Sequence, residues 1–144
     1  MTRLLDLDIE AFLISSTLLG SVAQRLVRII CPNCRETFPL LRDEFEGLGL
    51  SLPATYTEPE VQLTRGRGCL QCRKTTYMGR EAVFEVMLIT DTVRDMINQR
   101  MSVDEIKKQA CREGMHLLKE NAVEKILRGR TTYQEVLRCI SQAD

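Results

Sequence analysis

Two short stretches, Cys31-Pro32-Asn33-Cys34 and Cys69-Leu70-Gln71-Cys72, decide how the middle of this 144-residue chain is built. Each is a Cys-x-x-Cys knuckle that can offer two thiolates to one metal ion. Together they supply the four sulfurs of a structural zinc site, in which Zn–S distances are about 2.3 Å and no coordination position stays open for chemistry. The spacing therefore predicts a structural Zn²⁺ that stabilises a small subdomain, with Cys31, Cys34, Cys69 and Cys72 as ligands.

Other uses of these cysteines fit the sequence less well. An iron site of the rubredoxin type depends on glycines beside the cysteines, whereas here Arg35 and Arg73 follow the knuckles. A thioredoxin-like dithiol begins a helix, whereas Cys31 follows a segment expected to be helical. A secreted disulfide scaffold is disfavoured because no charged-then-apolar leader opens the chain and the remaining cysteines lie in helical patterns.

Composition sets few limits on the partner. The chain has 20 basic and 20 acidic residues, so no net charge attracts it to nucleic acid or to a membrane surface. Its apolar stretches are shorter than the roughly 20 residues that span a bilayer. We expect a cytoplasmic protein with no membrane insertion of its own.

The segments before and between the knuckles have distinct patterns. Apolar residues recur at three- and four-residue spacing over Ile9–Ile30, which predicts a long amphipathic helix with Asp8 as its cap. The helix should end before Pro32. Between the knuckles, Leu40–Phe45 predicts a helical turn and Glu60–Thr64 a short strand.

After the second knuckle, Arg80–Thr90 is rich in branched and aromatic residues and predicts a strand. Four short helices should follow, joined by a few residues as in a helical bundle. Their signals are a first helix through Val93–Ile97, a capping box at Ser102–Glu105, an end at Gly129 for the third, and a cap at Thr132. The predicted fold class is α+β, mostly helical.

No catalytic or cofactor-binding group can be assigned. His116, the only histidine, has no metal-ligand or triad motif around it, which favours a structural or surface role. Cys111 and Cys139 are read as small apolar core residues. The chain contains no Gly-x-x-x-x-Gly-Lys-Ser/Thr loop, so it should not hydrolyse nucleotides alone.

The second knuckle is surrounded by cations: Arg65, Arg67, Arg73, Lys74 and Arg80. A zinc module with a basic rim can bind nucleic acid, so a stand-alone zinc ribbon of that kind is the alternative function. The same cations can offset the charge of about −2 on a zinc with four thiolates. Tyr77 is the only aromatic residue nearby for base stacking, which favours the second interpretation.

Five motifs in order carry a resemblance. They are Thr2-Arg3-Leu4-Leu5-Asp6, Ala23–Arg28 leading into the first knuckle, Gly68 with the second knuckle, Gly79-Arg80 with Phe84-Glu85, and Gly129–Thr132 with Glu135-Val136-Leu137. This arrangement resembles the C-terminal part of the type II secretion and type IV pilus assembly ATPases, over nearly the whole chain.

The resemblance implies a fragment of a hexameric motor, with the ATP- and Mg²⁺-binding segments upstream. It implies that residues 1–30 form the C-terminal edge of a RecA-like ATPase core, residues 31–79 a tetracysteine zinc subdomain, and residues 80–144 a short strand with a C-terminal helical subdomain. The implied roles are structure and docking, on the cytoplasmic domain of an inner-membrane platform protein. Arg25 could approach a neighbouring nucleotide or subunit, and whether the motor serves secretion or piliation stays open.

The sequence departs from the family pattern at two places. Thr75-Thr76 stands where a Thr-Gly pair is usual before the tyrosine, and Asn121-Ala122 stands where Asp-Gly is common. Neither change touches a predicted metal ligand. The first is expected to alter the turn after the second knuckle.

Overall fold

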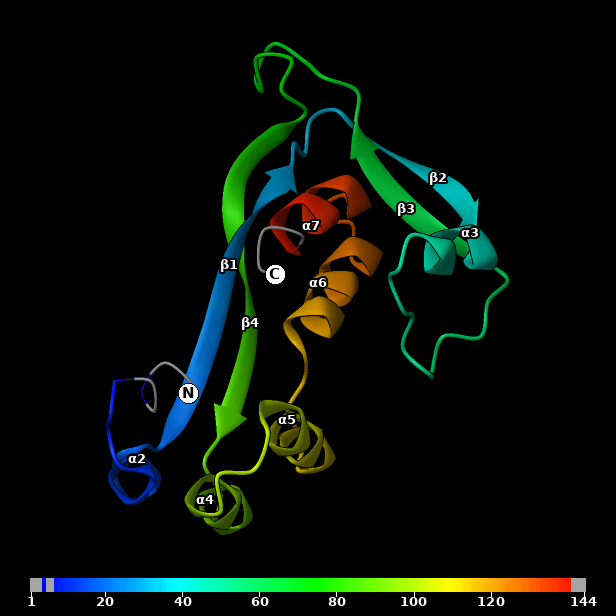
Figure 1. Cartoon of the computed structure of the whole chain (residues 1–144). Coiled ribbons are helices and arrows are strands. Elements are labelled where there is room, and N and C mark those ends of the chain that lie inside the picture. The colour runs from blue at the N-terminus through cyan, green and yellow to red at the C-terminus, as the bar shows by residue number, and fades with distance from the viewer. Residues whose placement is uncertain (1–3, 5–6, 141–144) are drawn as a thin grey trace. The chain divides into compact units, whose positions relative to one another are not determined.

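The computed structural model describes residue 4 and residues 7–140, which form a mixed α+β chain (Figure 1). The α+β class predicted from sequence is confirmed. In chain order the elements are α2 (Ala11–Thr17), β1 (Gly20–Ile30), β2 (Arg35–Leu41), α3 (Arg42–Gly47), β3 (Glu60–Gly66), β4 (Tyr77–Leu88), α4 (Asp91–Asn98), α5 (Val103–Arg112), α6 (Leu118–Leu127) and α7 (Tyr133–Ile140).

The chain groups into two compact units. Unit 1 consists of residues 1–23 and 85–117, and unit 2 of residues 24–84 and 118–144. The long strands β1 and β4 pair with each other and run in opposite directions, and each contributes residues to both units (Figure 1). The sequence-based division at residues 30 and 79, the RecA-like edge and the four-helix bundle stay predictions.

The long helix predicted over Ile9–Ile30 is wrong. Helix α2 covers only Ala11–Thr17, and β1 follows from Gly20 to Ile30. Asp8 is not its cap, since the capping position is Glu10 and makes no side-chain hydrogen bond to the helix. Pairing with β4 supplies the backbone partners of an extended segment rich in branched residues, and this distant pairing outweighs the local helical spacing.

The other predicted elements are largely confirmed. The strand expected at Glu60–Thr64 is β3, and the one expected at Arg80–Thr90 lies mostly in β4. The helical turn expected at Leu40–Phe45 is displaced, because Leu40 and Leu41 end β2 and α3 begins at Arg42. The four helices after β4 occur as predicted, and none of the described helices is long and apolar enough to cross a membrane.

Unit 1 has its own apolar core. It packs α2 and α4 around Ile89, with α5 contributing one face. Ser102 and Glu105 form the predicted capping box at the start of α5, and the Thr90 hydroxyl accepts a hydrogen bond from the amide of Val93 at the start of α4. The buried members of the core are Ala11, Ile14, Ile89, Val93, Ile97 and Ile106.

Unit 2 is built around the antiparallel β2–β3 hairpin. Its register pairs Arg35 with Gly66 and Leu41 with Glu60. Side chains from β3 and α3 pack against α6 and α7, since Val61, Phe45 and Ala122 are all fully buried. Gly129, at the end of α6, has φ +65° and lies so close to β3 that a Cβ there would be 2.8 Å from the Thr64 hydroxyl. Helices α3, α6 and α7, the β2–β3 hairpin and residues of β1 and β4 thus contribute to the core of unit 2.

Candidate metal centre

Both knuckles lie in the connections between the β1–β4 strand pair and the β2–β3 strand pair. The first, Cys31–Cys34, joins β1 to β2, and the second, Cys69–Cys72, lies between β3 and β4. The β2–β3 hairpin fixes the register next to both knuckles, and the amide of Arg67 donates to the carbonyl of Cys34 at 2.9 Å. On the other side, the amide of Cys31 donates to the carbonyl of Thr76 at 2.9 Å. The backbone therefore brings the two knuckles together.

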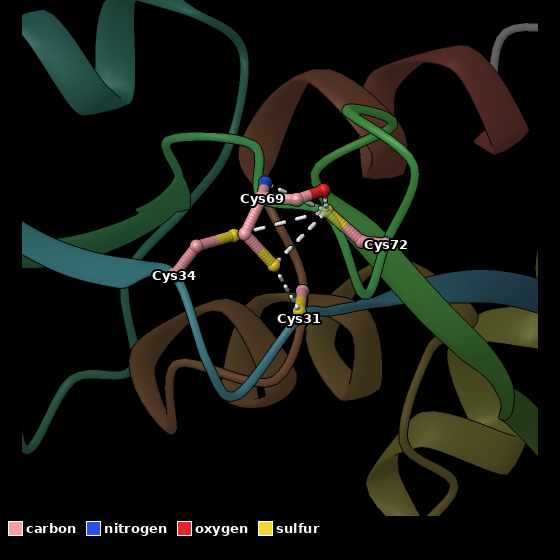
Figure 2. A group of neighbouring side chains, drawn as sticks. All are labelled: Cys31, Cys34, Cys69 and Cys72. Atoms are coloured by element: carbon pink, nitrogen blue, oxygen red, sulfur yellow. Dashed lines mark hydrogen bonds between the residues drawn. The ribbon is translucent and has the colours of Figure 1, made fainter.

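The four predicted cysteines converge on one point (Figure 2). Their sulfur atoms all lie within 4.8 Å of one another. The Sγ–Sγ distances are 3.8 Å between Cys31 and Cys69, 3.9 Å between Cys34 and Cys72, and 3.7 Å between Cys69 and Cys72. Cys31 and Cys72 are buried, and Cys34 and Cys69 are partly buried. Such a cluster could hold a metal ion.

The sulfur spacing distinguishes chelation from disulfide bonding. A disulfide needs about 2.0 Å between sulfurs, so all four thiols are free. A tetrahedron with Zn–S bonds of about 2.3 Å has edges of about 3.8 Å between its sulfurs. The three distances above, 3.7 to 3.9 Å, match these edges. The donor set therefore fits a tetrahedral, thiolate-binding ion such as Zn²⁺.

Backbone hydrogen bonds to the sulfurs favour thiolate, and they prevail at Cys72, whereas burial outweighs them at Cys34. The amide of Cys69 donates to the sulfur of Cys72 at 3.2 Å, and this backbone hydrogen bond is the main cause that lowers the pKa of Cys72 to about 6. Burial raises the pKa of Cys34 to about 11, against an opposing backbone hydrogen bond from Gly68. Amide-to-sulfur hydrogen bonds of this kind stabilise charge on a ligand sulfur.

The turn after the second knuckle carries backbone strain. Arg73, Lys74 and Thr76 have φ of 51°, 64° and 69°, in the left-handed region that a β-branched residue rarely adopts. Gly66 approaches this turn so closely that a Cβ there would be 2.6 Å from the carbonyl oxygen of Thr76. The resemblance implies glycine at position 76, and a glycine there would adopt this φ without the strain.

The basic residues around the knuckles divide into two groups. Arg65 and Arg67 both bind Glu36, with Nε–O distances of 2.8 and 2.9 Å. Arg73 and Lys74 are exposed at the turn, and no ion pair is found for them within the described residues. Two of the five predicted cations thus form surface ion pairs with a carboxylate of the same chain.

A buried carboxylate that sequence reasoning missed lies on α7. The side chain of Glu135 is fully buried and accepts hydrogen bonds from Arg28 and Arg138, the closest at 2.6 Å. Burial alone would raise the pKa of Glu135, but the two arginines outweigh it and lower the pKa to about 2. The sequence signal was Thr132-x-x-Glu135, read as a helix cap. The hydroxyl of Thr132 does accept from the Glu135 amide at 3.2 Å, while the carboxylate binds the arginines.

The remaining candidates are not brought to the cluster. His116 is exposed between α5 and α6, and Cys111 is partly buried on α5. Cys139 is buried in the core of unit 2, as predicted, and Arg25 is exposed on β1. Within the described residues, the four cysteines are the only group of three or more metal-ligating side chains.

Comparison with known proteins agrees with the resemblance. The family model of the type II/IV secretion system protein matches residues 1–138. A type II secretion system protein E from Pseudomonas aeruginosa is 38% identical over 138 residues, and one from Aeromonas hydrophila is 37% identical over 138 residues. The type IV pilus assembly ATPase PilB from Thermus thermophilus is 39% identical over 140 residues.

These alignments cover this chain but only part of each relative. They include 96% of this chain for both secretion proteins and 95% for PilB. The chain spans 26% of the length of each secretion relative and 15% of PilB. The match therefore concerns one region of longer proteins.

Proposed function

Because this chain belongs to the type II/IV secretion system protein family, we propose that it is the zinc-stabilised C-terminal region of a motor ATPase for protein secretion or pilus assembly. The single observation that carries the zinc assignment is the convergence of four cysteine sulfurs within 4.8 Å of one another. In this proposal Cys31, Cys34, Cys69 and Cys72 hold one Zn²⁺. A closed four-thiolate shell leaves no position for substrate, so the ion has a structural role.

In the proposed motor, this region does not perform the chemistry. The sequence contains no phosphate-binding loop, and the relatives that are named ATPases are several times longer. ATP and Mg²⁺ would bind elsewhere in the longer protein, which would assemble as a hexamer with residues 1–30 at the edge of its RecA-like core. Arg25, exposed on β1, is free to meet a neighbouring subunit in that assembly.

The proposed role of unit 2 is docking on the cytoplasmic domain of the inner-membrane platform protein. The chain would then act in the cytoplasm, at the membrane only through this partner. The turn after the second knuckle supports this proposal, because it presents Arg73 and Lys74 to solvent next to the cluster. An acidic patch on the partner would complement these charges. The stand-alone zinc ribbon that binds nucleic acid is not favoured, since the family match spans residues 1–138.

Zinc content is the first test of this proposal. Elemental analysis of the purified chain should find one zinc per molecule, and X-ray absorption should find four sulfur neighbours at about 2.3 Å. Protein grown with zinc available that contains no metal, or iron instead, would contradict the assignment.

Docking is tested in the full-length motor by reversing charge at the turn. The variant Arg73→Glu with Lys74→Glu should weaken binding to the platform's cytoplasmic domain, more strongly at low salt, and should reduce secretion or piliation. Zinc content and hexamer formation should persist. The matched control is Lys107→Glu with Lys108→Glu on α5, which also removes two exposed cations but lies in unit 1. Equal loss of binding in both variants would show that the turn is not the docking site.

A further inference from the structure

Arg28 and Ile30, near the end of β1, and the next residue, Cys31, form hydrogen bonds to segments that are distant in sequence. The amide of Arg28 donates to the carboxylate of Glu135 at 3.1 Å, and the carbonyl of Arg28 accepts from the Thr131 hydroxyl at 2.8 Å. The amide of Ile30 donates to the carbonyl of Arg130 at 2.9 Å. The segment that leads into α7 therefore holds the end of β1 directly before the first knuckle.

The side chain of Arg28 extends this contact to the second knuckle. Its guanidinium donates two hydrogen bonds to Glu135, at 2.6 and 3.0 Å, and stacks on the ring of Tyr77 with its carbon 4.1 Å from the ring centre. The hydroxyl of Tyr77 lies 2.7 Å from that of Thr132, the residue that caps α7. The four residues Glu135, Arg28, Tyr77 and Thr132 close a ring of contacts, which we call the Glu135 ring.

The Glu135 ring joins the strands that flank the two knuckles. Arg28 lies on β1, three residues before Cys31, and Tyr77 is the first residue of β4 after the turn of the second knuckle. The amide of Cys31 and the carbonyl of Thr76 meet between these two strands at 2.9 Å. A rotation or slip of either strand would move two of the four sulfurs away from the other two.

Glu135 is suited to this role because its carboxylate is committed to one arrangement. Its side chain has no exposed surface, whereas those of Arg28 and Arg138 are 43% and 51% exposed. A buried carboxylate that loses an arginine partner is strongly destabilised, so alternative positions of Arg28 are disfavoured. The low pKa of Glu135 keeps it ionised at neutral pH.

We propose that Glu135 is a positioning residue of the metal centre: through Arg28 and Tyr77 it holds the two knuckles in the geometry that binds the ion. This inference rests on the zinc site proposed above and extends it to a residue that touches no ligand sulfur. Groups that orient metal ligands without binding the ion themselves typically change metal affinity about 10- to 100-fold when removed. Glu135 should act within that range.

The test measures zinc affinity in the complete chain by competition with a chromophoric chelator. Glu135→Gln should weaken zinc binding about 10- to 100-fold. Tyr77→Phe keeps the stacked ring and loses one hydroxyl contact, so it should weaken binding about threefold. The matched control is Glu81→Gln, in the same unit, whose carboxylate binds Lys125 and Arg130 at 2.6 and 2.9 Å. This control should change zinc affinity less than twofold.

A spectrum separates positioning from general stabilisation. Co²⁺ bound to four thiolates absorbs visible light in a way that depends on the tetrahedral geometry, so the fully loaded Glu135→Gln variant should show shifted bands. The Glu81→Gln variant should show wild-type bands. Equal affinities and equal spectra for these two variants would overturn the inference.

Two further outcomes distinguish this inference from the proposed function. If the wild-type chain binds zinc through four thiolates and the Glu135 ring variants bind equally well, only the positioning role is wrong. If the wild-type chain binds no zinc, the proposed zinc site and the positioning role of Glu135 are both wrong. Should Glu135→Gln fail to fold, Tyr77→Phe decides, because unchanged affinity and spectrum in that variant would overturn the role of the ring.

Discussion

Unit 1 and unit 2 differ in the interactions that stabilise each of them internally. The core of unit 1 consists of aliphatic side chains such as Ile14, Val93 and Ile97, all almost fully buried, and α4 and α5 are capped by threonine and serine hydroxyls. Unit 2 has an apolar core too, but it adds a cluster of four thiols and the fully buried carboxylate of Glu135. Metal removal, oxidation of the thiols and protonation of Glu135 should therefore lower the stability of unit 2. Loss of buried apolar volume should lower the stability of whichever unit carries the substitution.

Metal removal should produce the largest difference in stability between the two units. With zinc bound to the four thiolates, a strong chelator should abolish amide protection at residues 31–34 and 69–76 and leave α4 and α5 protected. The loss should be large at the knuckles, whose fold depends on the ion, whereas the apolar core of unit 2 contains none of the four ligands and should stay folded. Hydrogen exchange followed by mass spectrometry gives the measurement.

The variant Cys69→Ser should have the same effect without chelator. Its control is Cys111→Ser on α5, which removes a thiol from unit 1 and should keep the zinc. If chelation made the amides of α4 and α5 exchange as fast as those of the knuckles, the two units would not differ in their dependence on metal.

The converse experiment acts on unit 1. Ile97 is 1% exposed and packs in the core of unit 1, so Ile97→Ala should destabilise this unit by about 3 kcal/mol through lost burial and a cavity. Zinc content should not change. Chemical denaturation with exchange readout at α4 and at β3 measures the two units separately, and equal loss at both would argue that they unfold as one.

Acid should act on the Glu135 ring. The pKa of Glu135 is lowered from 4.5 to about 2, so its contribution to stability is complete above pH 4.5 and is lost as pH falls toward 2. We expect about 1–2 kcal/mol, less than the full linkage value because both arginines are partly exposed to water.

The measurement compares the reduced, metal-free wild type with Glu135→Gln. The stability difference of unit 2 between them should be largest at pH 5.5 and should narrow at pH 3. The helices of unit 1 serve as the internal control, since they should respond to acid equally in both proteins. A difference in unit 2 that stays constant with pH would mean that the charge of Glu135 contributes nothing.

The smallest expected effect is an increase in stability. Thr76 has φ 69° with a β-branched side chain, so Thr76→Gly should relieve strain. Part of the gain is offset because glycine is more flexible in the unfolded chain, which leaves about 0.5–1 kcal/mol. Thermal unfolding of the zinc-loaded protein measures it, with Thr75→Gly as the control at the neighbouring position. A lower midpoint for Thr76→Gly would show that the threonine makes a favourable contact that outweighs its strain.

Features of the structure that depend on residues close together in the sequence could be predicted from local patterns. The knuckles, the capping box at Ser102 and the helix after Thr132 follow from side chains three or four positions apart, and the structure contains each of them. The strand β1 could not be predicted in this way. Its apolar residues recur at helical spacing, and only pairing with β4, about 50 residues later, determines its extended conformation.

The role of Glu135 was hidden for a similar reason. In the sequence it occupies the third position after a threonine cap, which is a common place for an exposed glutamate. One of its two arginine partners, Arg28, lies 107 residues earlier in the chain, and no local pattern links the two. The ion pair between Glu135 and Arg28 is therefore the part of this site that depends on the folded structure and not on local sequence.

The β2–β3 hairpin has a consequence for how quickly the metal centre can assemble. Cys31 and Cys69 are 38 positions apart, and closing a chain of that length by the ion alone would carry a large loop entropy. The hairpin can pair stepwise from Leu41 and Glu60 toward Arg35 and Gly66, so its first contact closes a shorter loop than the ion alone would have to close. We therefore expect the hairpin to form first and to bring the knuckles together before the ion arrives. Metal uptake by the nascent chain should then be limited by ion supply and ligand deprotonation, not by the search of one knuckle for the other.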